Sequence, residues 1–299
     1  METKTDEYVL ARDLTGSTRC ESPNLIAINP LTASANNQQP IHQYRLDAQH
    51  LLWKLYNGYT INPDIPISAD MKIAEIGTGT GIWLLDLASQ VPPTVQLDGY
   101  DLSSDQFPHK SILPSNMTLS TLDAFSDVPA ELAGKYDVVH MRFWCCVVKG
   151  NDPSRLVRHA AALLKPGGYL QWEDADLLNT IRVGDAAENF WKVAMATLAA
   201  CNFQFDWLGD LSTHATQAGL SVLHGEMGKM PPALIPLTTN TYLAGHVELF
   251  QVADKLTDPA VPSQAECLKV LSTLAAETKN GAMYHWRPVV LLAQKAAIQ

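Results

Sequence analysis

Lys72-Ile73-Ala74-Glu75-Ile76-Gly77-Thr78-Gly79-Thr80-Gly81 decides the fold of this chain, together with the apolar run at residues 82–89 that follows it. A short apolar run ended by an acid is typical of a buried strand, alternate glycines of a tight loop, and residues 82–89 of a helix. Glycines let a ligand approach the backbone, and a helix that starts beyond them presents free N–H groups. The stretch therefore predicts a strand, a ligand-binding loop and a helix, with an ordinary strand-to-helix turn as the alternative.

The spacing of the glycines distinguishes two kinds of ligand. In the dinucleotide fingerprint G-x-G-x-x-G the third glycine would fall at Ile82, whose side chain cannot fill that packing role. The pattern present is E-x-G-x-G-x-G, and a second acid, Asp101, ends the next strand-like segment about 20 residues further on. The loop therefore favours a cofactor other than a dinucleotide.

Length and composition are those of an ordinary globular protein, with 299 residues of which 46% are hydrophobic and 17% charged. The net charge of −10 and the lack of Lys/Arg runs argue against nucleic acid as a partner. Residues 1–10 lack a signal-peptide core, and no apolar stretch reaches the ~18 residues of a membrane span. The five cysteines have no C-x-x-C spacing, so we expect reduced thiols, a cytoplasmic location and no metal site.

Strand and helix patterns alternate through the middle of the chain, which predicts a parallel sheet covered on both faces. The predicted strands are residues 72–76, 95–100, 117–122, 136–141, 169–173, 221–227 and 287–294. The predicted helices are residues 82–90, 153–164, 186–207 and 210–218, with further helices and Pro-rich turns in residues 231–279. The Lys-Pro-Gly-Gly of residues 165–168 predicts a turn before the fifth strand.

Four motifs occur in order, at residues 75–83, 97–103, 135–142 and 164–172. Together they resemble the class I S-adenosylmethionine-dependent methyltransferases, and among these the fungal small-molecule methyltransferases of secondary metabolism, a group that also resembles the LaeA-type regulators. The resemblance covers residues 44–175 well and the carboxy-terminal third loosely. It implies an α/β fold with a doubly wound seven-stranded sheet, whose last strand is antiparallel, and helical cap insertions.

The resemblance also implies a division of the chain. We expect an N-terminal helical segment with an irregular insertion in residues 1–60, and a cofactor-binding core in residues 61–183. Cap elements are expected in residues 184–283, interleaved with a core helix and strand at 208–227, and the final core strand in residues 284–299.

S-adenosylmethionine is the cofactor that the resemblance implies. Glu75 is expected to take its ammonium directly or through water, and Asp101 its ribose diol, because a carboxylate accepts two hydroxyl hydrogen bonds at once. For Asp101 and Asp123 the alternative is an aspartate that only caps its loop. The full set of expected cofactor contacts is Glu75, Gly77, Thr78, Gly79, Gly81, Asp101, Leu102, Asp123, Ala124, Phe125 and Arg45.

Residues 20–45 interrupt the resemblance. In the family, a sequence like Ser17-Thr18-Arg19 runs directly into a helix like residues 46–56, whereas here a stretch rich in Asn, Gln, Ser and Pro intervenes. We interpret it as a surface loop or as a gene-model insertion such as a translated intron. Either Arg45 or Arg19 then occupies the family's arginine position before that helix.

The end of the fourth strand is where methyl-transfer chemistry is expected. It lacks the Asn/Asp-Pro-Pro-aromatic tetrad typical of enzymes that methylate base amino groups, which disfavours a nucleic-acid substrate. His140 is a candidate general base, a cofactor contact or a hydrogen-bonded core histidine. Arg142 could hold a substrate anion, but pairing with Glu173 or Asp174 is favoured.

Aromatic residues cluster in the predicted cap, where rings are more often core than pocket. Because class I enzymes place the substrate at the carboxyl ends of the strands, we expect some of these rings to line an apolar cleft. His214, His246 and His285 are further base candidates. The expected substrate contacts are Arg142, Phe143, Trp144, Trp172, Trp191 and Trp286.

Three functions remain open at this point. The favoured one is an enzyme that moves a methyl group from S-adenosylmethionine to O, N or S of a small, largely apolar metabolite. The second is a non-methylating enzyme of the dehydratase or pericyclase type that binds the same cofactor. The third is a regulatory protein of the LaeA type.

Overall fold

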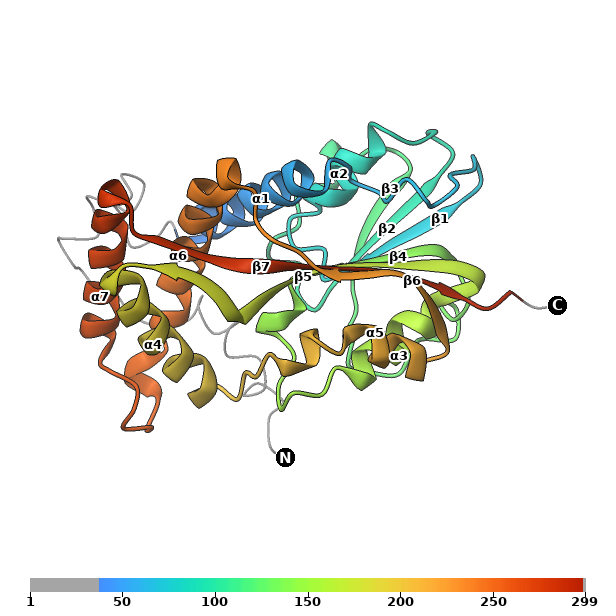
Figure 1. The fold of residues 1–299 in the computed structure, drawn as a ribbon. Helices are drawn as coiled ribbons and strands as arrows, with labels where there is room; N and C mark the ends of the chain where they lie inside the picture. Colours follow the sequence, from blue (N-terminus) through green and yellow to red (C-terminus); the bar gives the residue numbers. More distant parts are fainter. Residues whose placement is uncertain (1–37, 298–299) are drawn as a thin grey trace, which may run out of the picture.

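A seven-stranded sheet forms the centre of the molecule in the computed structural model, which describes residues 38–297 (Figure 1). The strand order is β3-β2-β1-β4-β5-β7-β6, and β7 pairs antiparallel with both of its neighbours. This confirms the predicted α/β fold with an antiparallel last strand. The strands are β1 Lys72–Ile76, β2 Gln96–Asp101, β3 Met117–Thr121, β4 Tyr136–Arg142, β5 Leu164–Val183, β6 Leu220–Met227 and β7 Met283–Lys295.

Helices cover both faces of the sheet and gather at one end of it. In Figure 1, α1 and α2 lie on one face, α3 and α5 on the other, and α4, α6 and α7 at the end where β5 and β7 project. Among the described residues, no helix has the length and apolar character needed to cross a membrane. The helices are α1 Gln38–Asn57, α2 Ile82–Ala88, α3 Ser154–Leu163, α4 Asp185–Ala200, α5 Leu211–Gln217, α6 Ile235–Phe250 and α7 Gln264–Glu277.

Alternation along the central strands decides which side chains meet each helix layer, because successive residues of a strand point to opposite faces. On β1, Ile73 packs with Trp83 of α2, whereas Ala74 packs in the other half of the core with Val157 of α3. Ile73 and Glu75 therefore share the α2 face. In the register between the strands, Glu75 lies beside His140 of β4, so the two side chains meet on that face.

The projecting part of the sheet is longer than the sequence pattern predicts. The fifth strand was expected to end at residue 173, but β5 continues to Val183 and pairs with the start of β7, where Arg182 lies opposite Tyr284. The predicted turn at residues 165–168 is also wrong in detail. It is an irregularity inside β5, since the pairing with β4 passes from Leu164 directly to Tyr169, and Gly167 has a φ of 81°.

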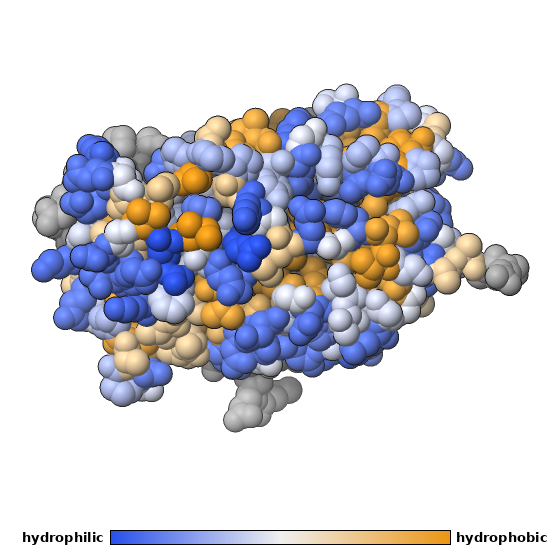
Figure 2. All heavy atoms as spheres, viewed as in Figure 1, coloured by the Kyte–Doolittle hydropathy of each residue, from blue (hydrophilic) through white to orange (hydrophobic). Residues whose placement is uncertain are grey.

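Two helix boundaries also differ from expectation. Helix α1 begins at Gln38, so residues 38–45 of the predicted irregular insertion are helical, while residues 20–37 lie outside the described part. The helix expected at residues 186–207 ends at Ala200, because the chain turns at Asn202, whose φ is 63°. Seen from this side, the surface is mostly hydrophilic, and its apolar side chains stand in small groups (Figure 2).

Candidate cofactor and substrate site

The glycine loop between β1 and α2 is held by the end of β2. The N–H groups of Gly77 and Thr78 donate to the Tyr100 carbonyl oxygen over 2.8 and 2.9 Å. Gly77, Gly79 and Gly81 have φ angles of 76°, 54° and 73°, a region that disfavours any residue with a Cβ atom. The alternate glycines are therefore required by the backbone of the loop itself, as the sequence predicts.

Helix α1 and an aromatic ring enclose this loop from two sides. Thr80 donates its hydroxyl to Asp47 of α1 over 2.8 Å, and a Cβ built on Gly79 would lie 3.2 Å from Leu46. A Cβ on Gly77 would lie 3.0 Å from the indole of Trp144, whose buried Nε1 has no hydrogen-bond partner. Trp144, predicted as a substrate contact, thus lies directly against the loop.

Asp101 ends β2, and Asp123 lies two residues after the end of the neighbouring parallel strand β3. Asp101 Oδ2 accepts the Gly79 N–H over 2.9 Å, and Asp123 Oδ1 accepts the Phe125 N–H over 2.9 Å. Both aspartates therefore cap loops, and Asp101 caps the glycine loop itself, while their contacts with the cofactor stay predictions. A nucleoside-containing cofactor fits these strand ends, because carboxylates suited to hydroxyl and amino groups lie next to exposed backbone at Gly77. The half-buried Leu102 and Phe125 and the buried Ala124 supply apolar surface there.

Glu75 is buried beneath the loop, with 3% of its surface exposed. Its Oε2 accepts the Thr78 hydroxyl over 2.6 Å, and its Oε1 lies 3.3 Å from His140 Nδ1. The carboxylate thus acts on the loop through Thr78. Its predicted contact with the cofactor ammonium, directly or through water, stays a prediction.

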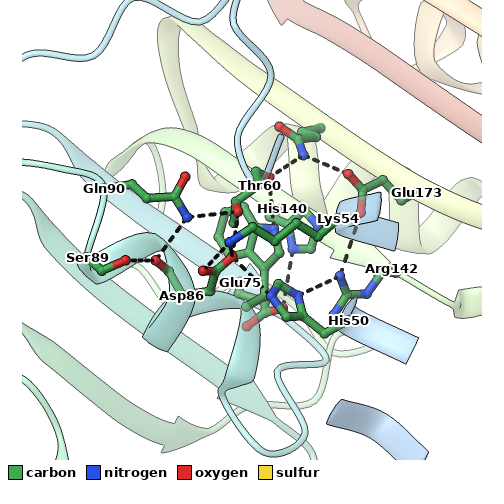
Figure 3. Close-up of polar contacts among 12 residues, drawn as sticks. His50, Lys54, Thr60, Glu75, Asp86, Ser89, Gln90, His140, Arg142 and Glu173 are labelled. Atoms are coloured by element: carbon green, nitrogen blue, oxygen red, sulfur yellow. Dashed lines mark hydrogen bonds and ion pairs between the residues drawn. The ribbon is translucent and has the colours of Figure 1, made fainter. Parts of the chain in front are cut away.

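His140 is fully buried between two carboxylates (Figure 3). Its ring stacks on Trp83 with centroids 3.8 Å apart and planes at 3°. Nε2 lies 3.4 Å from Glu173 Oε2, whereas Nδ1 lies 3.3 Å from Glu75 Oε1 without forming a hydrogen bond. The burial and the hydrogen bond to Glu173 are those of a core histidine, and the interpretations of His140 as a general base or a cofactor contact stay predictions.

Glu173 joins His140 to helix α1 and to Arg142. Its carboxylate accepts hydrogen bonds from Asn57 over 2.8 Å and from Gln171 over 2.9 Å. Arg142 Nη1 lies 3.8 Å from it, the pairing favoured from the sequence. Burial opposes ionisation of Glu173, but the interactions with His140, Arg142 and Gln171 outweigh it and lower its pKa.

A second polar group continues from Arg142 towards α2. Arg142 donates to His50 Nδ1 over 3.3 Å, and His50 Nε2 lies 3.1 Å from Asp86, which also binds Lys54 at 2.6 Å. Burial and the Arg142 charge lower the pKa of His50 to about 4, although Asp86 opposes this. Sequence reasoning assigned no task to His50, Asn57 or Asp86, because their partners are distant in the chain.

Arg45 was predicted as a cofactor contact. In the structure its guanidinium binds Glu248 of α6 through two contacts of 2.9 Å each. This bidentate pair connects α1 to the cap helices. A contact between Arg45 and the cofactor stays a prediction.

Phe143 and Trp286 form an aromatic wall with Trp53 of α1. Phe143 lies edge-on to both indoles, at 6.0 Å from Trp53 and 5.7 Å from Trp286, and the two indoles stack at 5.2 Å. Phe143 has a φ of 58° and donates its N–H to the Glu173 carbonyl over 3.0 Å, which fixes the wall to β5. The wall therefore stands at the carboxyl end of β4, as predicted for substrate contacts.

Trp172 and Trp191 lie away from this wall. Trp172 is fully buried, packs on Trp207 and donates to Asp174 over 2.9 Å. Trp191 is half-buried beneath Arg182, whose guanidinium carbon lies 4.3 Å from the ring centroid. Both have structural partners, and their contact with a substrate stays a prediction.

The three further histidines, His246, His285 and His214, lie in different surroundings. Phe190, Tyr242, His246, Phe250 and Tyr284 form a cluster that we call the cap rings. His246 belongs to it, and its buried Nε2 has no hydrogen-bond partner. Burial and the Arg45 charge lower its pKa to about 4, although a hydrogen bond to Tyr242 opposes this. His285 follows Tyr284 on β7 and so faces the opposite side, and His214 lies on α5.

Comparison with known proteins identifies the family of the chain. A family model described as a methyltransferase domain matches residues 52–224. The N-methyltransferase tcpN of Claviceps purpurea is 32% identical over 203 residues, which cover 65% of this chain and 71% of tcpN. The N-methyltransferase verN of Clonostachys rogersoniana is 34% identical over 144 residues, covering 46% of this chain but only 47% of verN.

A solved structure shows the same fold. The phosphoethanolamine N-methyltransferase 2 of Haemonchus contortus, in complex with S-adenosyl-L-methionine, superposes with a TM-score of 0.52 at 14% identity. The superposition covers 93% of this chain and 60% of that one. The chain thus belongs to the methyltransferase domain family, as a class I enzyme whose methyl donor is S-adenosylmethionine.

Proposed function

We propose that this methyltransferase acts on a nitrogen atom of a small, largely apolar and uncharged molecule of fungal secondary metabolism. The observation that carries the proposal is the aromatic surrounding of the glycine loop. Trp144 lies against Gly77, and its neighbour in the chain, Phe143, packs edge-on against Trp286 of β7. Flat apolar molecules gain most from aromatic neighbours, and Phe143 is the half-buried ring of this group, whereas Trp144 and Trp286 are 7% and 1% exposed.

The charges beside this wall favour an uncharged acceptor. Arg142 is the cation at the end of β4, and Glu173 and His50 already engage it at 3.8 and 3.3 Å. An anionic group on the substrate would have to displace these buried partners, which is unfavourable.

A nitrogen acceptor is supported by the position of His140 and by the printed names of two relatives. A neutral amine carries a free lone pair and can attack the methyl group without prior deprotonation, whereas a hydroxyl is helped by a base. His140 is fully buried and engaged by Glu75 and Glu173, so it is poorly placed to serve as that base. tcpN and verN are named as N-methyltransferases.

The residues of the site then have distinct tasks. The cofactor supplies a reactive methyl sulfonium, so proximity and orientation account for most of the acceleration that the protein must provide. Asp101 would bind the ribose hydroxyls, and Asp123 with Ala124 and Phe125 would hold the adenine edge. Trp144 and the aromatic wall would exclude water and align the acceptor. The thiols of Cys145, Cys146, Cys201 and Cys267 are free, which supports a reducing location such as the cytoplasm.

The experiment supplies the enzyme with S-adenosylmethionine that carries a trideuterated methyl group. Matched panels of aromatic amines, amides, phenols and thiols serve as acceptors, and mass spectrometry with fragmentation locates the label. Asp101→Ala is the control for cofactor-dependent transfer. Label on nitrogen supports the proposal, and label on oxygen or sulfur alone contradicts it. Cofactor binding without any transfer, but with chemical conversion of a substrate, would favour the non-methylating class instead.

A further inference from the structure

Three buried side chains form a row across the middle of the sheet, on the face that α1 and α2 cover (Figure 3). Glu75, His140 and Glu173 come from β1, β4 and β5, and none has more than 3% of its surface exposed. We call them the buried row. The strand register places Glu75 beside His140 and Arg142 beside Glu173, so alternate residues bring all three side chains to one face.

The imidazole lies between two buried carboxylates and forms a hydrogen bond with one of them, Glu173, through Nε2. A buried carboxylate without compensation is strongly unfavourable. The two ring nitrogens of His140 lie 3.3 Å from Glu75 and 3.4 Å from Glu173, one on each side. The remaining oxygens have partners of their own, Thr78 for Glu75 and Asn57 with Gln171 for Glu173.

The partners at the two ends of the row belong to different parts of the site. At one end, Glu75 holds the hydroxyl of Thr78, which is a residue of the glycine loop. At the other end, Glu173 binds Asn57 of α1 and contacts Arg142 at the end of β4, where the aromatic wall begins. His140 is the side chain through which these two ends are joined.

We propose that His140 is a positioning residue, which couples the geometry of the glycine loop to the Glu173–Arg142–Asn57 group without touching the cofactor. Cofactor affinity then depends on hydrogen bonding and charge at a side chain buried below the loop. The inference uses only the cofactor of the proposed function and does not depend on the identity of the methyl acceptor.

Two substitutions of His140 separate its packing against Trp83 from its proposed positioning role. The ring of His140 stacks on Trp83, and His140→Phe retains an aromatic ring for that stack while removing both nitrogens. His140→Gln does the reverse, since its amide keeps polar hydrogens for the carboxylates but loses the stack. If His140 only fills space, the Phe variant is the milder of the two.

The first measurement is calorimetric titration of each folded variant with S-adenosylmethionine and with S-adenosylhomocysteine. We expect His140→Phe to weaken both affinities about tenfold, as found for coupled polar neighbours, and His140→Gln to restore part of the loss. Tyr136→Phe is the control, because it removes a hydroxyl that donates to another buried carboxylate, Asp98, over 2.9 Å and is also hydrogen-bonded to the Tyr100 hydroxyl over 2.7 Å. That control should lower the melting temperature and leave cofactor affinity unchanged.

The second measurement keeps the proposal testable if His140→Phe does not fold. Thr78→Val removes the hydroxyl that links the loop to Glu75, and it is combined with His140→Gln in a double-mutant cycle for cofactor affinity. We expect the loss caused by Thr78→Val to be at least threefold smaller in the His140→Gln background, because the link is already weakened. An equal loss in both backgrounds, or a control that loses as much affinity as His140→Phe, overturns the proposal. Such an outcome leaves methyl transfer itself intact, because transfer is measured separately with the labelled cofactor.

Discussion

The buried row below the glycine loop and the cap rings beyond the end of the sheet are both buried from solvent, but the row consists of ionisable side chains and the cap mainly of aromatic rings. The row consists of titratable groups whose carboxylate oxygens have partners, such as Thr78 for Glu75 and Asn57 for Glu173, while Nδ1 of its imidazole makes no hydrogen bond. The cap consists of rings packed edge to face, and its one imidazole, His246, keeps a buried nitrogen without a partner. A charged interior fixes geometry through specific partners, whereas an apolar one fixes mainly volume and shape.

The largest effect is expected when the row is broken at Glu173. Glu173→Ala leaves Asn57, Gln171 and Arg142 without their common acceptor in the interior. Removal of one partner from a buried charged group typically costs about 3–5 kcal/mol. We expect the free energy of unfolding, measured by denaturant titration, to fall by about that amount.

A substitution in the cap tests whether the loss of stability in Glu173→Ala comes from the charge of the row or only from its burial. Phe190→Leu removes a fully buried ring from the cap rings but leaves no charge behind. We expect a smaller loss than for Glu173→Ala. Equal losses in the two variants would show that the row is no more specific than ordinary packing.

Cofactor affinity sharpens the comparison, because Asp101 lies at the loop but outside the row. Asp101→Ala removes the proposed acceptor of the ribose hydroxyls and should weaken S-adenosylmethionine binding by about 2–3 kcal/mol, the scale of hydrogen bonds to charged groups. Titration calorimetry on the folded variant measures this. Because Asp101 also accepts the Gly79 N–H, Asp101→Asn serves as control, since it keeps an acceptor oxygen for that bond. Unchanged affinity in the alanine variant would remove Asp101 from the site.

We expect low pH to reduce the stability of the protein through His246 in the cap, whose pKa is lowered from 6.5 to about 4. Above pH 6.5 the ring is neutral in the folded and the unfolded chain, and its contribution to stability is fully present. As the pH falls towards 4, the unfolded chain takes up a proton that the folded chain does not, and stability is lost. Between pH 7 and 5 this amounts to about 2 kcal/mol.

The variant His246→Phe isolates this contribution from that of other groups, such as His50. We expect the variant to lose less stability between pH 7 and 5 than the unchanged chain, as measured by urea unfolding at both pH values. Parallel pH profiles in the two proteins would show that His246 is not responsible.

The sequence alone predicted the structure correctly where the structure depends on residues that are neighbours in the chain. The glycine spacing of residues 77–81 specifies the loop because the required φ angles are local, and β1 was predicted with its exact bounds. The extension of β5 was missed since Asp174 and Asp176 interrupt its apolar alternation. In the structure their carboxylates accept N–H groups, that of Trp144 for Asp174 and that of Leu178 for Asp176.

The enclosure of His140 could not be predicted for a related reason. From its place at the end of the fourth strand, the residue was expected to be a general base, a cofactor contact or a hydrogen-bonded core histidine. Its actual neighbours, Trp83 and Glu173, lie 57 and 33 positions away in the sequence, and nothing in the local pattern connects them to it. Only the strand register and the position of α2 show that the ring is enclosed.

The smallest effect is expected where α1 meets the cap. Arg45 and Glu248 form a bidentate pair whose side chains are 13% and 17% exposed, so solvent screens part of their attraction. Partly exposed pairs contribute up to about 1 kcal/mol, and we expect a coupling of that size in a double-mutant cycle of Arg45→Met and Glu248→Gln, measured by denaturant unfolding. The same variants test the expected cofactor contact of Arg45. If Arg45 binds the cofactor, Arg45→Met weakens S-adenosylmethionine binding far more than Glu248→Gln does. Similar affinities in the two variants would indicate that Arg45 joins α1 to the cap and that the cofactor contact predicted from the sequence is wrong.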